Sequence, residues 1–160
     1  MFLTRRNLLA LFASATVATP ALADTGPADM VVVFKSSRRL VLYRDGSPFR
    51  SFRIGLGWAP DGDKEFEGDG RTPEGSYYIN RRNPRSNFHL SLGISYPDPN
   101  QIAQAAAKGI DPGGDIFIHG GLGQGRQRGD WTAGCIAVSN RHIEEIWQLV
   151  PDGALIVIQP

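Results

Sequence analysis

Cysteine and histidine are scarce in this chain of 160 residues, which has a single cysteine, Cys135, and three histidines. One cysteine excludes an internal disulfide. A domain of this length buries about two thirds of the surface of its unfolded chain, so it needs neither a disulfide nor a metal to fold. No pair of the possible ligands has the short spacing typical of a zinc site; these ligands are His89, His119, Cys135 and His142.

A long hydrophobic run is also missing. The apolar run Leu8 to Ala18 has eleven residues, whereas a membrane-spanning helix needs about 20. Arg5 and Arg6 precede it, and Ala21-Leu22-Ala23 follows as a small-x-small cleavage pattern. The pattern predicts an export signal over residues 1–23 rather than the alternative, a membrane anchor.

The predicted mature chain begins at Asp24, and residues 24–29 form a short tether. Because Asp24 is not a cysteine, no lipid attachment is expected, and the product would be periplasmic or secreted without a stable membrane anchor. The pair Arg5-Arg6 fits a twin-arginine signal, although an ordinary secretory signal also carries positive charge. Both routes stay open.

An excess of charge of either sign is missing as well. The chain has 17 basic and 16 acidic residues, and removal of the predicted leader takes away two arginines. A nucleic-acid-binding protein normally has a basic excess clustered on one face, so no nucleic-acid partner is expected. Fourteen of the basic residues are arginine, a bias that suits carboxylate recognition.

Strand patterns outnumber helix patterns between residues 30 and 160, which we interpret as one domain. A polar loop rich in glycine and proline spans residues 55–75, and two helices are expected, one at Gln101 to Lys108 and one after a cap at Ser139 or Asn140. The predicted architecture is mainly β with two or three short helices. The predicted strands are Met30–Phe34, Leu40–Tyr43, Phe49–Ile54, Ser76–Ile79, Phe88–Tyr96, Asp115–Ile118, Cys135–Val138 and Ala154–Ile158.

Cys135 follows Gly134 and precedes the helix expected near Asn140. Backbone N–H groups at such a place can lower the pKa of a thiol and hold an oxyanion. The alternative interpretation is a buried, unreactive thiol.

His119 ends a predicted strand, and 15 residues separate it from Cys135. Adjacent strand ends would bring the two side chains within hydrogen-bond range, where an imidazole can serve as the base for a thiol nucleophile. A core histidine is the alternative.

At these residues the sequence resembles the L,D-transpeptidase catalytic domain of the YkuD type, found in bacterial peptidoglycan enzymes. The resemblance lies in His119-Gly120, in the pattern Thr132-x-Gly134-Cys135 and in the segment Thr72-Pro73-Glu74-Gly75. It extends in order and size over Met30 to Pro160.

The resemblance implies a β-sandwich catalytic domain that uses no cofactor and no metal. Cys135 would be the nucleophile, His119 its general base, the Gly120 carbonyl the group that orients His119, and the N–H groups of Gly134 and Cys135 the oxyanion donors. The implied partner is a peptidoglycan stem tetrapeptide. Cys135 would attack the carbonyl at the L-centre of diaminopimelate and release D-alanine, after which an amine gives a cross-link and water gives hydrolysis.

Two positions depart from the commonest family pattern. Ala137 stands where that pattern has arginine, and Ala133 where it often has histidine. Arg126, Arg128 or Arg141 could supply the missing guanidinium, or each could be a solvated charge. The alanine variant resembles a branch that hydrolyses peptidoglycan linkages, including the attachment of a lipoprotein to diaminopimelate.

Three further side chains are candidates for substrate binding: Thr132, His89 on a predicted strand, and Trp131 beside the Gly-rich loop. Each could instead be structural. The charged residues of the 55–75 loop suggest a glycosidase only by composition, and ion pairs that fix the loop are the preferred interpretation; these residues are Glu67, Asp69, Arg71 and Glu74.

The alternative from another functional class is a non-catalytic cell-wall-binding domain. Such a domain would explain export, but it would not need Cys135 and His119 together. Papain-like wall peptidases place cysteine before histidine, the reverse of the order here.

Overall fold

A computed structural model describes residues 26–125 and 127–160. The predicted leader, its cleavage site and Arg126 lie outside the described residues. The fold is mainly β with two helices, as the sequence predicts. The elements are β1 Met30–Phe34, β2 Arg39–Arg44, β3 Ser47–Arg53, β4 Gly75–Ser86, β5 His89–Ile94, α1 Pro99–Ala107, β6 Phe117–His119, β7 Ile136–Ala137, α2 Asn140–Leu149 and β8 Leu155–Gln159.

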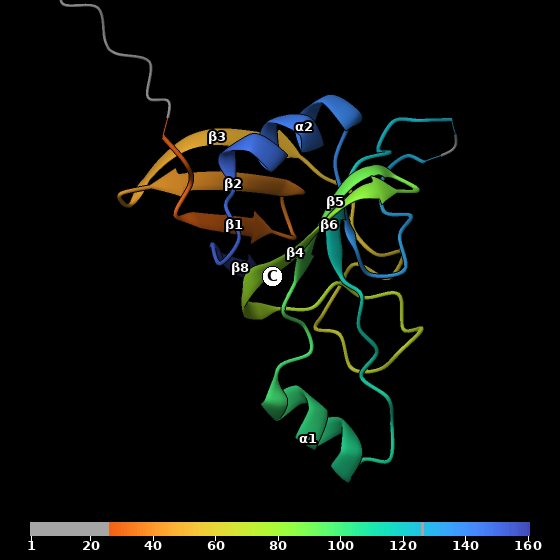
Figure 1. Ribbon diagram of the computed structural model, residues 1–160. Coiled ribbons are helices and arrows are strands. Elements are labelled where there is room, and N and C mark those ends of the chain that lie inside the picture. Colours follow the sequence, from red (N-terminus) through yellow and green to blue (C-terminus); the bar gives the residue numbers. More distant parts are fainter. Residues whose placement is uncertain (1–25, 126) are drawn as a thin grey trace, which may run out of the picture.

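The strands form a continuous series in the order β3-β2-β1-β8-β4-β5-β6-β7. The predicted meander of β1, β2 and β3 is antiparallel throughout, and β8 joins it parallel to β1. The strand β4 belongs to two sheets, because Gly75–Tyr78 pairs with β8 whereas the remainder pairs with β5. Figure 1 shows β4 passing from the β1–β3 side of the molecule to the β5–β6 side.

β4 is much longer than the predicted strand Ser76–Ile79. Its second half, residues 80–86, is polar and mostly exposed, so it lacks the apolar alternation that marks a half-buried strand. Backbone pairing with β5 nevertheless extends to Ser86 opposite His89, with a register shift after Ile79. This polar extension forms part of the candidate site described below.

A single core connects the two sheets and α2. Its fully buried side chains come from β1, β2, β4, β5, β6, β7, α2 and β8, and they include Leu40, Leu42, Tyr77, Ile79, Leu92, Ile94, Ile118, Ile136, Ile143, Ile146 and Ile156. Ala28 also belongs to this core, and its N–H donates to the Leu149 carbonyl. Part of the predicted 24–29 tether therefore packs with the domain.

Each helix begins at a side-chain cap. Asp98 and Gln101 form a capping box at α1, with Pro99 in the first turn, and the Ser139 hydroxyl accepts from His142 N–H at the start of α2. α2 packs on β5 and β6, and Figure 1 shows α1 at the opposite end of the molecule. Neither helix of the described residues is long and apolar enough to span a bilayer.

Candidate active site

The parallel pair β6 and β7 brings His119 and Cys135 to one pocket. Ile118 lies opposite Ile136 and His119 opposite Ala137, so Cys135, just before β7, lies near Phe117. The pocket has a volume of about 290 Å³. It is lined by Asn83, Ser86, Asn87, Phe88, Ser91, Asp115, Phe117, His119 and Cys135.

The His119 ring is held on several sides. Its Nδ1 lies 2.6 Å from the carbonyl oxygen of Gly120, so Nδ1 carries the proton and Nε2 is left as an acceptor. Phe88 stacks on the imidazole at 4.5 Å between centroids, and Trp131 meets it edge-on at 5.7 Å. His119 is only 3% exposed. Burial lowers its pKa, partly offset by the bond to Gly120, so the imidazole is neutral at pH 7.

The Cys135 thiol points toward Asp115 rather than His119. Its Sγ donates to the Asp115 carbonyl at 3.5 Å, and no hydrogen bond joins it to His119 among the described residues. Burial raises the pKa of the thiol; the Phe117 N–H and the Lys64 ammonium oppose that effect, and the Asp115 carboxylate adds to it. The lowered thiol pKa predicted from the sequence is therefore wrong, because β7 separates Cys135 from the start of α2 and burial dominates.

We expect the alkylation of Cys135 by iodoacetamide to follow this raised pKa. The thiolate is the nucleophile, so the rate should rise with pH and reach half its maximum above pH 8.5, the ordinary value for cysteine. A stopped-flow or mass-spectrometric rate profile from pH 6 to 10 measures it. A midpoint below pH 8 would contradict the neutral thiol; the C135A variant is the blank.

The backbone before Cys135 is fixed by Thr132. The Thr132 hydroxyl donates to the Cys135 carbonyl at 2.7 Å and accepts from the Gly134 N–H at 3.1 Å. Thr132 is 5% exposed, so its predicted contact with substrate is replaced by a role within the loop. The Gly134 N–H, predicted as an oxyanion donor, is likewise occupied by this hydrogen bond to Thr132. Within the described residues the Cys135 N–H has no acceptor.

Gly134 is required by both conformation and space. Its φ is +137°, a region that L side chains rarely adopt, and a Cβ there would lie 2.7 Å from the Arg71 carbonyl oxygen. The loop that precedes Cys135 therefore rests directly on the segment that contains Thr72-Pro73.

The 63–74 segment is held by ion pairs, as preferred from the sequence. Asp69 accepts from Lys64 Nζ at 2.8 Å and from the N–H groups of Glu65, Phe66 and Arg71. Burial opposes ionisation of Asp69, but these four donors outweigh it and lower its pKa. Farther along, Arg71 pairs with Glu65 and Glu74 with Lys35.

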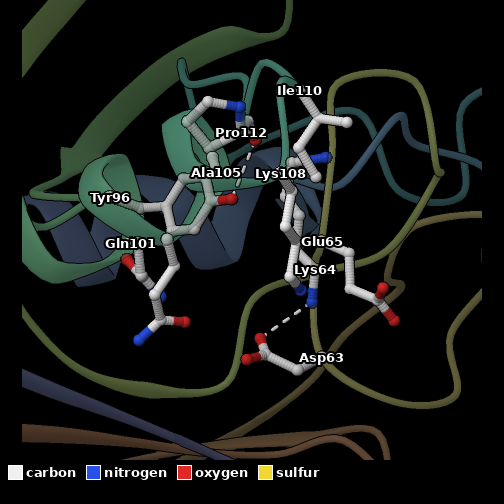
Figure 2. Close-up of a pocket in the computed structure, with 10 residues that line it drawn as sticks. Asp63, Lys64, Glu65, Tyr96, Gln101, Ala105, Lys108, Ile110 and Pro112 are labelled. Atoms are coloured by element: carbon white, nitrogen blue, oxygen red, sulfur yellow. Dashed lines mark hydrogen bonds between the residues drawn. The ribbon is translucent and has the colours of Figure 1, made fainter.

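A second pocket, about 220 Å³ in volume, lies between α1 and this segment. In Figure 2, Lys64 and Lys108 lie on one side of it, with Tyr96 and Gln101 on the other. The side chain of Tyr96 donates to the Pro112 carbonyl. None of the sequence-predicted site residues lines this pocket.

Several predicted substrate contacts are absent from the Cys135 pocket. His89 turns outward, with Nε2 2.7 Å from Glu144 of α2. Arg128 lines another pocket, with Arg38, Arg53 and Asp130.

Two more predicted contacts lie elsewhere. Arg141 is exposed in the first turn of α2 and does not line the pocket. Trp131 contacts the edge of the His119 imidazole instead of lining the pocket, and it lies beside Phe88, at 5.4 Å between ring centroids.

Sequence reasoning missed the polar residues that β4, β5 and the loop before β6 contribute. Asn83, Ser91 and Asp115 line the pocket, and Arg81 pairs with Asp115 at its edge. The only available signal was the run of polar residues after Ile79, which periodicity does not assign to a strand. The residues described contain no cluster of three or more potential metal ligands.

The sequence of this chain matches the family model of the L,D-transpeptidase catalytic domain, YkuD, over residues 28–158. The chain belongs to this family. The match covers all ten elements up to residue 158, including the strands that hold His119 and the loop that holds Cys135.

A curated sequence relative carries the same family description. The chain is 32% identical over 136 residues to the Escherichia coli K12 protein named "Putative L,D-transpeptidase YafK", covering 81% of this chain and 50% of that protein. It therefore spans about half the length of the curated relatives it matches.

Solved structures share the fold. The helical cell shape determining protein Pgp2 of Campylobacter jejuni superposes with a TM-score of 0.65 at 27% identity, over 84% of this chain and 48% of that one. An L,D-transpeptidase of Mycobacterium smegmatis gives a TM-score of 0.57 at 14% identity, over 83% and 59% of the chains. The second likeness shows the fold alone.

Proposed function

We propose that this domain is an exported L,D-transpeptidase that acts on peptidoglycan stem tetrapeptides through a thioester on Cys135. The observation that carries the proposal is the shared pocket of Cys135 and a neutral His119 whose Nδ1 is committed to Gly120. That contact leaves Nε2 as the free basic nitrogen, as a general base requires.

The first step joins Sγ to a substrate carbonyl. Cys135 rotates from the Asp115 carbonyl toward His119, and Nε2 takes the thiol proton as Sγ attacks the carbonyl at the L-centre of diaminopimelate. The Cys135 N–H, which has no acceptor in the described residues, donates to the oxyanion; such a donor contributes roughly 3 to 4 kcal/mol in comparable sites. The imidazolium then gives its proton to the departing nitrogen, and D-alanine leaves.

The second step consumes the thioester. His119, neutral again, takes a proton from the incoming nucleophile, and the thiol is regenerated. An amine from a second stem yields a cross-link, whereas water yields a tripeptide stem. Burial lowers the pKa of the His119 imidazole. The fall of kcat/KM on the acid side should therefore lie below pH 6.5, the ordinary value for histidine.

Hydrolysis is the second candidate. Ala137 lies opposite His119 in the β6–β7 register and is fully buried, and alanine in place of the commoner arginine resembles the branch of the family that hydrolyses peptidoglycan linkages. The same active site would then act as an L,D-carboxypeptidase, or as an amidase that releases a lipoprotein linked to diaminopimelate.

Incubation with purified tetrapeptide stems, followed by mass spectrometry of the products, tests these proposals together. Dimers support transfer, and tripeptides with free D-alanine support hydrolysis. Unchanged stems bound with measurable affinity would instead favour a non-catalytic wall-binding domain. The C135A variant should form neither product.

We also propose that residues 1–23 direct export to the periplasm or the medium. N-terminal sequencing of the exported protein should then begin at Asp24. Replacing Arg5 and Arg6 by lysine should block export if the twin-arginine route is used, because that route reads the pair itself. Unchanged export of the lysine variant would assign the general secretory route, and a start at Met1 would contradict cleavage.

A further inference from the structure

Three strands present a common face toward the pocket. Antiparallel pairing sets Arg81 opposite Gly93 and Gly93 opposite Phe117, forming one row across β4, β5 and β6. The next row is Asn83, Ser91 and His119. Directly opposed residues project from the same face of a sheet, so the Arg81 side chain lies on the face that holds His119.

Gly93 allows Arg81 to cross that face. A Cβ on Gly93 would lie 2.5 Å from the Arg81 Cγ, so any other residue would push the arginine away. The guanidinium instead lies 4.5 Å above the centroid of the Phe117 ring and donates from Nη2 to Asp115 at 2.6 Å. A ring and a carboxylate that both line the pocket therefore hold Arg81 at its edge, while half of the arginine side chain stays exposed.

Asp115 links this guanidinium to the nucleophile. Its carbonyl oxygen accepts from Cys135 Sγ at 3.5 Å, and its carboxylate accepts from Arg81. A single aspartate thus spans the distance from thiol to guanidinium. In the proposed substrate, the D-alanine carboxylate is likewise separated from the attacked carbonyl by one residue.

We propose that Arg81 is the specificity-determining residue that binds the carboxylate of the terminal D-alanine, in competition with Asp115. This inference rests on the proposed function, and it names the group that the site selects. The Asp115 carboxylate is 82% exposed, so it can turn into water when a substrate carboxylate arrives. The planar guanidinium of Arg81 then binds the substrate carboxylate instead of Asp115.

The test compares a tetrapeptide stem ending in D-alanine with the same stem ending in D-alaninamide. The amide has lost the charge that Arg81 would bind. For R81A, kcat/KM should fall about 10- to 150-fold on the acid, the effect of losing one charged hydrogen bond, and change little on the amide. R81K should recover part of the loss, because lysine keeps the charge without the fork.

Binding gives a second readout that does not need turnover. In the C135A background, calorimetry should show the acid binding more tightly than the amide, and R81A should remove the difference. In the same C135A background, D115N should lower the Kd for the acid and leave the Kd for the amide nearly unchanged, since asparagine tolerates the φ of +55° at this position and no longer competes for Arg81.

Arg50 provides a matched control. Its side chain is also 49% exposed and pairs with Glu145 at 2.9 Å, but it lies on β3 away from the pocket. R50A should therefore behave as the wild type on both peptides.

Equal losses for R81A on acid and amide, or no loss on either, would overturn the assignment of Arg81. A D115N variant that loses activity as R81A does would also overturn it, because Arg81 would then act by holding Asp115. A wild-type enzyme that turns over neither peptide would instead refute the proposed function.

Discussion

Replacing Cys135 by alanine is expected to reduce release of D-alanine from stem tetrapeptides by roughly 10⁴- to 10⁶-fold, and His119→Ala should do nearly the same. In the proposed mechanism the two side chains act in one proton transfer, since Nε2 is the acceptor left when Nδ1 contacts Gly120. The double variant should therefore be no slower than the worse of the single variants. Single-turnover rates measured by chromatography give these values.

His89→Ala is the control for this experiment. His89 is exposed and contacts Glu144 instead of lining the pocket, so its removal should leave the rate within a factor of about two of the wild type. If the losses of the two single variants multiply in the double variant, Cys135 and His119 act in separate steps and the dyad is refuted.

Replacing Lys64 by methionine should lower the free energy of unfolding by about 3 to 5 kcal/mol. Lys64 and Asp69 are each only 3% exposed in their side chains, so the substitution leaves a buried carboxylate without its cation. Because the folded pKa of Asp69 is lowered, its stabilising contribution is present above the unfolded value of about 3.9 and is lost as the pH falls through the folded pKa. Urea denaturation at pH 7 and at pH 3 measures both effects.

The exposed pair of Arg71 and Glu65 supplies the comparison, with side chains 35% and 56% exposed. Glu65→Gln should cost less than about 1 kcal/mol, because solvent screens such pairs. Adding Asp69→Asn to the Lys64 variant should restore part of the lost stability by removing the stranded charge. No difference between K64M and E65Q would contradict the buried-pair assignment.

The predictable parts of the molecule follow from local patterns. Apolar β-branched runs predicted the positions of β1, β2 and β8, and the capping residues Asp98 and Ser139 predicted where both helices begin. Cys135 and His119 share a pocket because β6 and β7 lie side by side; the sequence suggested adjacent strand ends, but not that the two strands are parallel.

The remaining parts depend on contacts that no local pattern specifies. Arg81 comes to the edge of the pocket through the pairing of β4 with β5 and the missing side chain of Gly93. Arg128, close to Cys135 in sequence, turns to another pocket. The sequence predicted a lowered pKa for the Cys135 thiol from the nearby start of a helix, which is a local feature. The pKa is raised instead, because burial depends on the whole fold.

The place of β8 between β1 and β4 has a consequence for how the chain matures. The β1–β3 meander can form early, and so can the hairpin of β4 with β5, but among the described residues only Leu155–Gln159 joins them by pairing with both. Until residue 159 has been synthesised, a nascent chain therefore exposes two sheet edges with unpaired backbone N–H and C=O groups. Such edges can pair with other chains and cause aggregation. Variants shortened before Leu155 should accumulate in aggregates, and the pairing of distant β1 and β8 should make closure the slow event of folding.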